Sequence, residues 1–152
     1  MPYSLSSQLN KDIDYFVLDG NSNMFHFASA GTLLPEIIIQ NYKENRKIHS
    51  SILATKELYD IEINPNLDNI IQFENNVMRE LYLKDFIFYA QRGCYSYDKT
   101  YITDFNDPRY HLVVSPINTK KNNNMKNKLL FEELSINIKL DKTNTIDINA
   151  LK

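Results

Sequence analysis

The sequence predicts an α+β fold in which a mainly antiparallel β-sheet packs against two helices in a single domain. Three observations lead to this class. The chain has 152 residues, the usual size of one domain. Hydrophobic residues make up 43% of it and charged residues 24%, as in ordinary globular proteins. Segments that alternate apolar and polar residues, typical of strands, are interspersed with two segments of helical periodicity.

The first two predicted strands form a β-hairpin. Residues 15–18 and residues 24–29 are β-prone, and a turn-rich segment separates them. Pro35 can occupy the first turn of a following helix, which we place at residues 35–53. The β-branched run Ile37, Ile38 and Ile39 could instead form a strand. The polar residues 1–11 are a candidate flexible end.

A short strand and a long helix follow. Residues 58–63 alternate, which predicts a strand with one apolar and one acidic face. Apolar residues at spacings of three and four predict a helix at residues 65–92, with Asn64 as its cap and Gly93 at its end. The apolar last turns, residues 86–90, are expected to be buried by the sheet.

The last third of the chain begins with a predicted loop at residues 94–109. Residues 110–115 then predict a strand that Pro116 ends, and the polar residues 118–128 predict an exposed basic loop. Two final segments predict a pair of strands: residues 134–140, which alternate, and residues 146–148.

The charge and the cysteine content narrow the class of protein. The net charge of −2 and the isoelectric point near 5.9 disfavour a nucleic-acid partner, since such binding depends on neutralising phosphates. The single cysteine, Cys94, cannot form an internal disulfide, which favours a reducing cytoplasm. No run approaches the roughly 20 apolar residues that cross a bilayer, so no membrane association is expected. The richness in Asn, Ile and Lys indicates an AT-rich, bacterial genome.

Motifs for cofactors and metals are missing from the sequence. Phosphate-binding loops need closely spaced glycines, whereas the three glycines are Gly20, Gly31 and Gly93. Zinc sites need several converging Cys and His ligands, and the chain has one cysteine and three dispersed histidines. We therefore expect no cofactor and no metal, and a non-enzymatic role is favoured.

Two enzymatic alternatives remain open. Cys94 and His111 could act as a thiolate nucleophile and its base, although a buried cysteine is the simpler interpretation. His26 and His111 lie on different predicted strands and could serve as acid and base in a phosphodiesterase-like hydrolase. Neither histidine is followed by the His-x-Ser or His-x-Thr pattern expected of two-histidine phosphoesterases.

The most suggestive feature is the interleaving of aromatic and acidic residues in the predicted loop. Tyrosines provide large, stiff contact areas, and carboxylates pair with arginine, so this composition suits recognition of a basic protein surface. The alternative is that the tyrosines pack at the edge of the core and the aspartates form turns. The candidate partner-binding residues are Tyr95, Tyr97, Asp98, Tyr101, Asp104 and Asp107, joined by Asp60 and Glu62 of the preceding strand.

These observations favour a small bacterial, cytoplasmic protein that binds and inhibits a partner protein. Toxin-immunity proteins act in this way, and the expected partner is a basic toxin domain whose active site is covered. The first alternative is a small hydrolase using His26 and His111 or Cys94. The second alternative is a structural subunit whose edge strand pairs with another copy.

Overall fold

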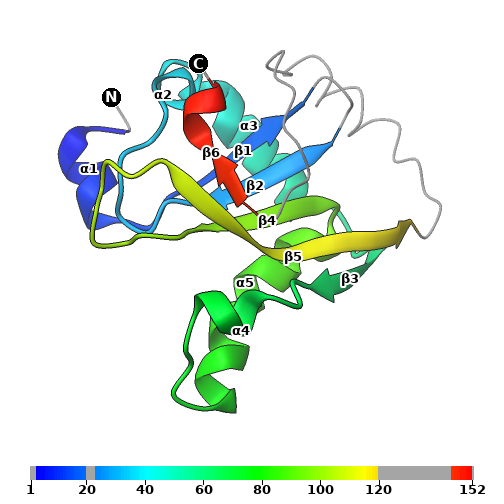
Figure 1. The fold of residues 1–152 in the computed structure, drawn as a ribbon. Coiled ribbons are helices and arrows are strands. Elements are labelled where there is room, and N and C mark those ends of the chain that lie inside the picture. Colours follow the sequence, from blue (N-terminus) through cyan, green and yellow to red (C-terminus); the bar gives the residue numbers. More distant parts are fainter. Residues whose placement is uncertain (1–2, 20–22, 120–144, 152) are drawn as a thin grey trace.

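The computed structural model describes residues 3–19, 23–119 and 145–151. It confirms the α+β fold and contains a six-stranded sheet in the order β1-β2-β4-β5-β3, with β6 also paired to β5 (Figure 1). The elements in chain order are α1 (Leu5–Asn10), β1 (Asp14–Leu18), β2 (Met24–Ala28), α2 (Glu36–Gln40), α3 (Tyr42–Leu53), β3 (Tyr59–Ile63), α4 (Leu67–Ile70), α5 (Asn76–Gln91), β4 (Cys94–Lys99), β5 (Arg109–Thr119), β6 (Thr145–Asp147) and the 3-10 helix η1 (Ile148–Leu151).

The sheet is mainly antiparallel, with one parallel pair. The predicted hairpin is confirmed, because β1 and β2 pair antiparallel from Asp14 opposite Ala28 to Leu18 opposite Met24. β2 and β4 run parallel, since the chain crosses over between them through α2, α3, β3, α4 and α5. β4 with β5, β5 with β3, and β5 with β6 are all antiparallel.

The first predicted helix is interrupted. α2 ends and α3 begins at Asn41, whose backbone departs from helical geometry at φ −110° and ψ 35°. The carbonyl of Ile37 accepts both the backbone N–H of Asn41 at 3.1 Å and its side-chain amide at 2.8 Å. The isoleucine run lies in α2, so its interpretation as a strand is wrong.

The second predicted helix is also interrupted, at residues 71–75. Asn75, rather than Asn64, caps the long helix, because its Oδ1 accepts the N–H of Met78 at 2.9 Å. Asn64 is buried and donates to the carbonyl of Leu112 at 2.8 Å, which ties the end of β3 to β5. Gly93 has φ +98° and ends the helix as expected.

Two predictions for the last third of the chain are wrong. Residues 94–99 form β4 rather than a loop. Successive side chains of this strand point to opposite faces of the sheet, and both faces are buried, as Ser96 and Tyr97 show, so the strand lacks the apolar–polar alternation. β5 continues through Pro116 instead of ending there. Pro116 lies opposite Ile61 of β3 but beyond Val114, the last residue of β5 that pairs with β4, so the strand has a neighbour on one side only at this point and tolerates a proline.

The C-terminal strand, β6, pairs with β5 and places Ile146 opposite Tyr110. The predicted strand at residues 134–140, and the part of the predicted basic loop from residue 120 to 128, lie outside the described residues. At the other end of the chain, where residues 1–11 were a candidate flexible end, α1 forms with Ser4 as its cap.

Apolar side chains cover both faces of the sheet. One face packs against α3 and α5, with Phe16, Ile52, Leu83 and Phe86 among the buried residues. The other face carries an aromatic core whose members are Tyr15, Phe25, Phe27, Tyr97 and Tyr110, covered by Leu34, Ile38 and Ile146. Within the described ranges, no helix combines the length and apolar character required to cross a bilayer.

Candidate functional site

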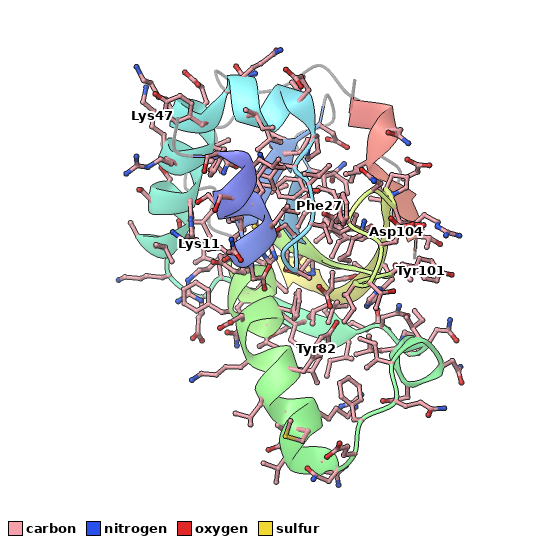
Figure 2. All side chains as sticks on the ribbon, turned by 90° about the vertical axis from the view of Figure 1, so that its left-hand side faces the viewer. Lys11, Phe27, Lys47, Tyr82, Tyr101 and Asp104 are labelled. Carbon is pink, nitrogen blue, oxygen red and sulfur yellow. The ribbon has the colours of Figure 1, made fainter. Side chains whose placement is uncertain are left out.

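The connection between β4 and β5, residues 100–108, carries a group of exposed apolar side chains. We call it the β4–β5 loop. Tyr101 is 47% exposed, Ile102 63% and Phe105 48%. Figure 2 shows Tyr101 on the side of the molecule that carries β6 and η1. Large apolar side chains that gather on a surface often mark a protein contact.

Hydrogen bonds within the loop shape it. The N–H of Thr100 donates to the carbonyl of Arg109 at 3.1 Å and closes its base. The N–H of Asp104 donates to the carbonyl of Tyr101 at 3.3 Å, and the N–H of Asp107 donates to the carbonyl of Asp104 at 3.1 Å. The Asp104 carboxylate also accepts the N–H of Asn106 at 3.0 Å. The loop is therefore a series of closed turns.

Two further hydrogen bonds fasten the loop to neighbouring segments. The N–H of Leu33 donates to the carbonyl of Phe105 at 3.3 Å, and the N–H of Ile148 donates to the carbonyl of Pro108 at 2.9 Å. Leu33 precedes α2, and Ile148 begins η1. The exposed side chains consequently project from a loop with anchors on both of its flanks.

The charges of the loop divide into a paired and an exposed set. Arg109 contacts Asp107 through two nitrogens, Nη2 at 2.6 Å and Nε at 3.0 Å, and this pairing lowers the pKa of Asp107 to about 2. The Arg109 guanidinium also stacks on the Tyr101 ring, 4.1 Å from its centroid. Asp104 is exposed, and in the part of the chain that the structure describes it has no ion pair.

The structure places three of the predicted partner-binding residues on β4 rather than in the loop. Tyr97 is fully buried, with its ring 5.4 Å from that of Phe27. Asp98 is buried and accepts hydrogen bonds from the Tyr82 hydroxyl at 2.6 Å and the N–H of Lys99 at 2.9 Å. Tyr95 is half-buried on the aromatic face. Tyr97 and Asp98 therefore cannot meet a partner in the folded protein.

Asp60 and Glu62 are exposed, but they lie far from the loop. In β3 they pair with Ile117 and Ser115, near the end of β5, whereas the loop joins β5 at Arg109. At about 3.3 Å per residue, Asp60 is roughly 26 Å along the strand from that junction. The structure therefore does not bring these two carboxylates to the β4–β5 loop. Of the predicted partner-binding residues, Tyr101, Asp104 and Asp107 lie in that loop.

A second polar cluster lies between the sheet and α5. His26 Nε2 is 2.7 Å from Asp14 Oδ1, and His26 Nδ1 is 3.2 Å from Ser96 Oγ. Serine, histidine and aspartate also follow one another in a hydrolase triad, but there the Nε2 atom faces the serine and Nδ1 the aspartate, the reverse of the arrangement of His26. Ser96 is fully buried and His26 is 1% exposed, and the Tyr89 ring covers the imidazole at a centroid distance of 4.0 Å. A substrate therefore cannot reach the Ser96 hydroxyl. The hydrogen bonds from Ser96 through His26 to Asp14 instead join β4, β2 and β1.

The network continues outward to α3. The Tyr89 hydroxyl donates to Asp14 Oδ2 at 3.2 Å, and His49 Nε2 is 3.0 Å from the same hydroxyl. Burial by itself would raise the pKa of Asp14. The hydrogen bond to His26, the charge of His26 and the hydrogen bond from Tyr89 together outweigh burial, so the pKa of Asp14 is lowered. The cluster thus links β1, β2, β4, α3 and α5 through one carboxylate.

His111 belongs to a separate cluster on the same face. Its Nδ1 is 3.1 Å from Thr100 Oγ1, and its Nε2 is 3.4 Å from the Tyr82 hydroxyl, which donates to Asp98. Burial lowers the pKa of His111 to about 4, so the ring is neutral at physiological pH. His26 and His111 lie on β2 and β5 with β4 between them, so they do not form an acid–base pair.

Cys94 lies in the interior at the start of β4. It is fully buried beside Phe16 and Leu18, and burial raises its pKa, which suppresses the thiolate. His111 lies opposite Asp98, four residues further along β4, at roughly 13 Å by strand rise. The two side chains are not placed for nucleophilic catalysis.

A surface hollow of about 420 Å³ lies beside α4 and the start of α5. Its lining includes Phe73 and Arg79, and Arg79 Nε is 3.0 Å from Asp68 Oδ1. Within the described ranges, no group of three or more His, Cys, Asp or Glu side chains could hold a metal ion.

The sequence interpretation missed Ile102 and Phe105, because it weighed tyrosines and carboxylates alone. The available signal was that these two large apolar residues lie among turn-forming residues. They fit neither a strand nor a helix pattern that would predict their burial. Comparison of the chain with protein-family models, with curated proteins and with solved structures finds no significant match.

Proposed function

We propose that this protein binds a partner protein through the β4–β5 loop and acts in the bacterial cytoplasm as an inhibitor, as toxin-immunity proteins do. The observation that carries the proposal is the exposure of Tyr101, Ile102 and Phe105 on an anchored loop. A few apolar and aromatic side chains provide most of the energy of protein recognition.

The geometry of the loop supports binding in two ways. Closed turns and flanking anchors hold the backbone in place, so little conformational entropy is lost when a partner docks. Asp104 adds an exposed carboxylate between Ile102 and Phe105 in the chain, where it can pair with an arginine or lysine of a basic partner. A projecting loop of this kind suits occlusion of an active-site cleft.

The hydrolase alternative has weaker support. His26, Ser96 and Cys94 are all inaccessible, and the pKa of His111 is too low for a base that works near neutral pH.

A capture experiment tests the binding proposal. Immobilised wild-type protein is compared with Ile102→Ala/Phe105→Ala in a lysate of the source organism, with Leu53→Ala as matched control because Leu53 is also exposed, at the end of α3. We expect one protein to bind stoichiometrically to the wild type and the control, and at least about tenfold less to the loop variant. Equal capture by all three proteins would contradict the proposal.

Asp104→Asn separates the electrostatic contribution from the apolar one. With the captured partner, we expect a slower association rate at low salt, and a difference that shrinks as salt rises, because screening removes the attraction between exposed charges. The proposal that the protein inhibits its partner requires that the partner's own activity falls when one equivalent of the wild-type protein is added. A partner that stays fully active in the complex would leave binding intact and refute inhibition.

A further inference from the structure

A chain of four polar side chains connects α5 with the base of the β4–β5 loop. The Tyr82 hydroxyl donates to Asp98 Oδ2 at 2.6 Å, and the same hydroxyl lies 3.4 Å from His111 Nε2. His111 Nδ1 lies 3.1 Å from Oγ1 of Thr100, the first residue of the loop. Figure 2 shows Tyr82 on the side of α5 that faces the sheet. We call these four residues, Tyr82, Asp98, His111 and Thr100, the relay.

The pairing of β4 with β5 holds the centre of the relay together. Asp98 lies opposite His111 in this pairing, and both side chains are buried. In the part of the chain that the structure describes, the Tyr82 hydroxyl has two hydrogen-bond partners, Asp98 and His111. A hydroxyl has one proton to donate. The Tyr82 proton can therefore serve only one of the two partners at a time, while the Tyr82 oxygen accepts from the other.

The direction of these hydrogen bonds follows from the charge of Asp98. An ionised carboxylate only accepts, so the Tyr82 proton points to Asp98, and the distance of 2.6 Å is typical of a charge-assisted bond. The Tyr82 oxygen then accepts from His111 Nε2, which must carry the imidazole proton. The neutral ring has no second proton, so its Nδ1 accepts from the Thr100 hydroxyl.

Protonation of Asp98 reverses this direction. Asp98 Oδ1 accepts the N–H of Lys99 at 2.9 Å, so the added proton resides on Oδ2, the oxygen that faces Tyr82. Oδ2 then donates to the Tyr82 oxygen, and the Tyr82 proton turns to His111 Nε2. His111 consequently carries its own proton on Nδ1 and donates it to Thr100 Oγ1.

We infer that the relay is a proton-dependent switch, in which the protonation state of Asp98 selects the tautomer of His111 and determines whether the Thr100 hydroxyl donates or accepts at the base of the β4–β5 loop. The imidazole stays neutral in both states. When Asp98 is protonated, His111 no longer uses the Thr100 proton, which is then available to the loop or to a molecule bound there.

Uptake of one proton accounts for the whole change. Thr100 is half-buried, and a proton from solvent bonds to its Oγ1 as the original hydroxyl proton passes to His111 Nδ1. The His111 Nε2 proton passes to the Tyr82 oxygen, and the Tyr82 proton passes to Asp98 Oδ2. Each proton moves by one hydrogen bond, and the negative charge of Asp98 is neutralised.

The surroundings of Asp98 place the switch near pH 6. Burial raises the pKa of Asp98 to about 6 against the opposing hydrogen bond from Tyr82, and repulsion from Asp12, which precedes β1, adds to the rise. Tyr82 and His111 face Asp98 from α5 and β5, and Ala28 lies beside it in β2. Burial lowers the pKa of His111 to about 4, so His111 gains no charge while Asp98 titrates.

Nitrogen-15 NMR of the imidazole rings in the purified full chain, from about pH 5 to about pH 8, tests this inference. The protonated and the bare nitrogen of a neutral imidazole have well-separated chemical shifts. We expect His111 to change from the Nε2-protonated to the Nδ1-protonated tautomer as the pH falls through about 6, together with the carboxyl carbon of Asp98. A single tautomer over the whole range, or conversion to imidazolium, would overturn the proposal.

Asp98→Asn should hold the relay in its protonated direction at every pH. The N–H of Lys99 still requires an oxygen acceptor, so the amide nitrogen of the new side chain faces Tyr82 and donates, as the protonated carboxyl does. We expect His111 to carry its proton on Nδ1 throughout the pH range in this variant. An Nε2-protonated His111 in Asp98→Asn would contradict the switch.

Tyr82→Phe removes the group that connects Asp98 to His111. The Asp98 carboxyl should still titrate, whereas the His111 tautomer should no longer follow the pH. Tyr89→Phe is the matched control, because Tyr89 also lies on α5 and donates to a carboxylate, that of Asp14, outside the relay. It should switch like the wild type. A His111 tautomer that still changes in Tyr82→Phe would overturn the proposal.

Backbone amide spectra of the same samples verify that every variant is folded and report on the loop. The amide signals of residues 100–108 should shift with the midpoint of the His111 change in the wild type and stay constant near that pH in Asp98→Asn. Loop signals that do not respond in the wild type would refute the connection to the loop. The measurement uses the free protein, so its outcome is independent of partner capture, and the two proposals can fail separately.

Discussion

Asp98 shows how burial changes the chemistry of a single residue. Burial raises its pKa to about 6, and repulsion from Asp12 adds to the effect, while hydrogen bonds from Tyr82 and the N–H of Lys99 oppose it. In the unfolded chain the same carboxyl titrates near 3.9. The folded state therefore holds the proton more tightly than the unfolded chain does.

This difference predicts a pH dependence of stability. Because the folded pKa is raised, Asp98 lowers the free energy of unfolding as pH rises from about 4 to about 6, by about 2 to 3 kcal/mol in total. Asp98→Asn removes this titration. We expect the stability of the variant relative to wild type to improve by that amount between pH 4 and pH 7, measured by urea denaturation at each pH.

Asp107→Asn is the control for that measurement. Its pKa is lowered to about 2, so its stabilising contribution is present above about pH 4 and is lost only as the pH falls further. The difference between this variant and the wild type should stay constant from pH 4 to pH 7. An Asp98→Asn variant that behaves in the same way would refute the raised pKa.

At the residue scale, the sequence identified part of the candidate site. It singled out Tyr101, Asp104 and Asp107, which the structure places in the exposed loop. It could not separate Tyr101 from Tyr97, because both belong to one aromatic-acidic run and only the pairing of β4 with β2 and β5 buries Tyr97. Long-range pairing of this kind is not encoded in local composition.

At the scale of elements, the edge of β1 depends on a side chain from α3. Asn45 is 3% exposed, and its Oδ1 accepts the N–H of Phe16 at 2.8 Å while its amide donates to the Tyr3 hydroxyl at 2.9 Å. A buried N–H without a partner is costly. The helix therefore completes the hydrogen bonding of the strand.

Asn45→Ala should lower the free energy of unfolding by roughly 1 to 3 kcal/mol, because the Phe16 N–H loses its acceptor. Tyr3→Phe removes only the other hydrogen bond and should cost about 1 kcal/mol or less. Chemical denaturation measures both values, and amide hydrogen exchange at Phe16 should accelerate only in the first variant. Equal losses in the two variants would contradict this role of Asn45.

Local patterns predicted the elements that depend on local signals. The hairpin, the strand at β3 and the end of α5 at Gly93 were all predicted, since turn residues, alternation and a glycine with positive φ act within a few residues. The breaks at Asn41 and at residues 71–75 were missed. The second break depends on the side chain of Asn75, which caps α5 by accepting the N–H of Met78, and the first on the backbone angles of Asn41; apolar periodicity registers neither.

At the scale of the whole molecule, the sheet separates an aromatic core from the polar clusters under α3 and α5. Tyr15, Phe27 and Tyr97 stack on one face, whereas His26, Asp14 and His111 lie on the other. The parallel pairing of β2 with β4 creates this arrangement, because it sets His26 beside Ser96 and Phe27 beside Tyr97. The candidate contact residues lie outside both layers.

This separation predicts opposite outcomes for two tyrosines of the same segment. Tyr97→Ala should lower the free energy of unfolding by about 3 to 5 kcal/mol, since it leaves a cavity between Phe25 and Phe27 in the aromatic core. Tyr101→Ala should cost less than about 1 kcal/mol, as it removes only an exposed ring and its stacking on Arg109. Thermal and urea unfolding measure both.

Because domains of this size are stable by only about 5 to 15 kcal/mol, the first substitution removes a large share of that stability, and a loss of binding in it would not distinguish damage to the fold from loss of a contact. Tyr101→Ala keeps the fold, so its effect on partner capture reports the contact itself. If Tyr101→Ala proved as destabilising as Tyr97→Ala, the loop would belong to the core, and the β4–β5 surface would have to be abandoned as a binding site.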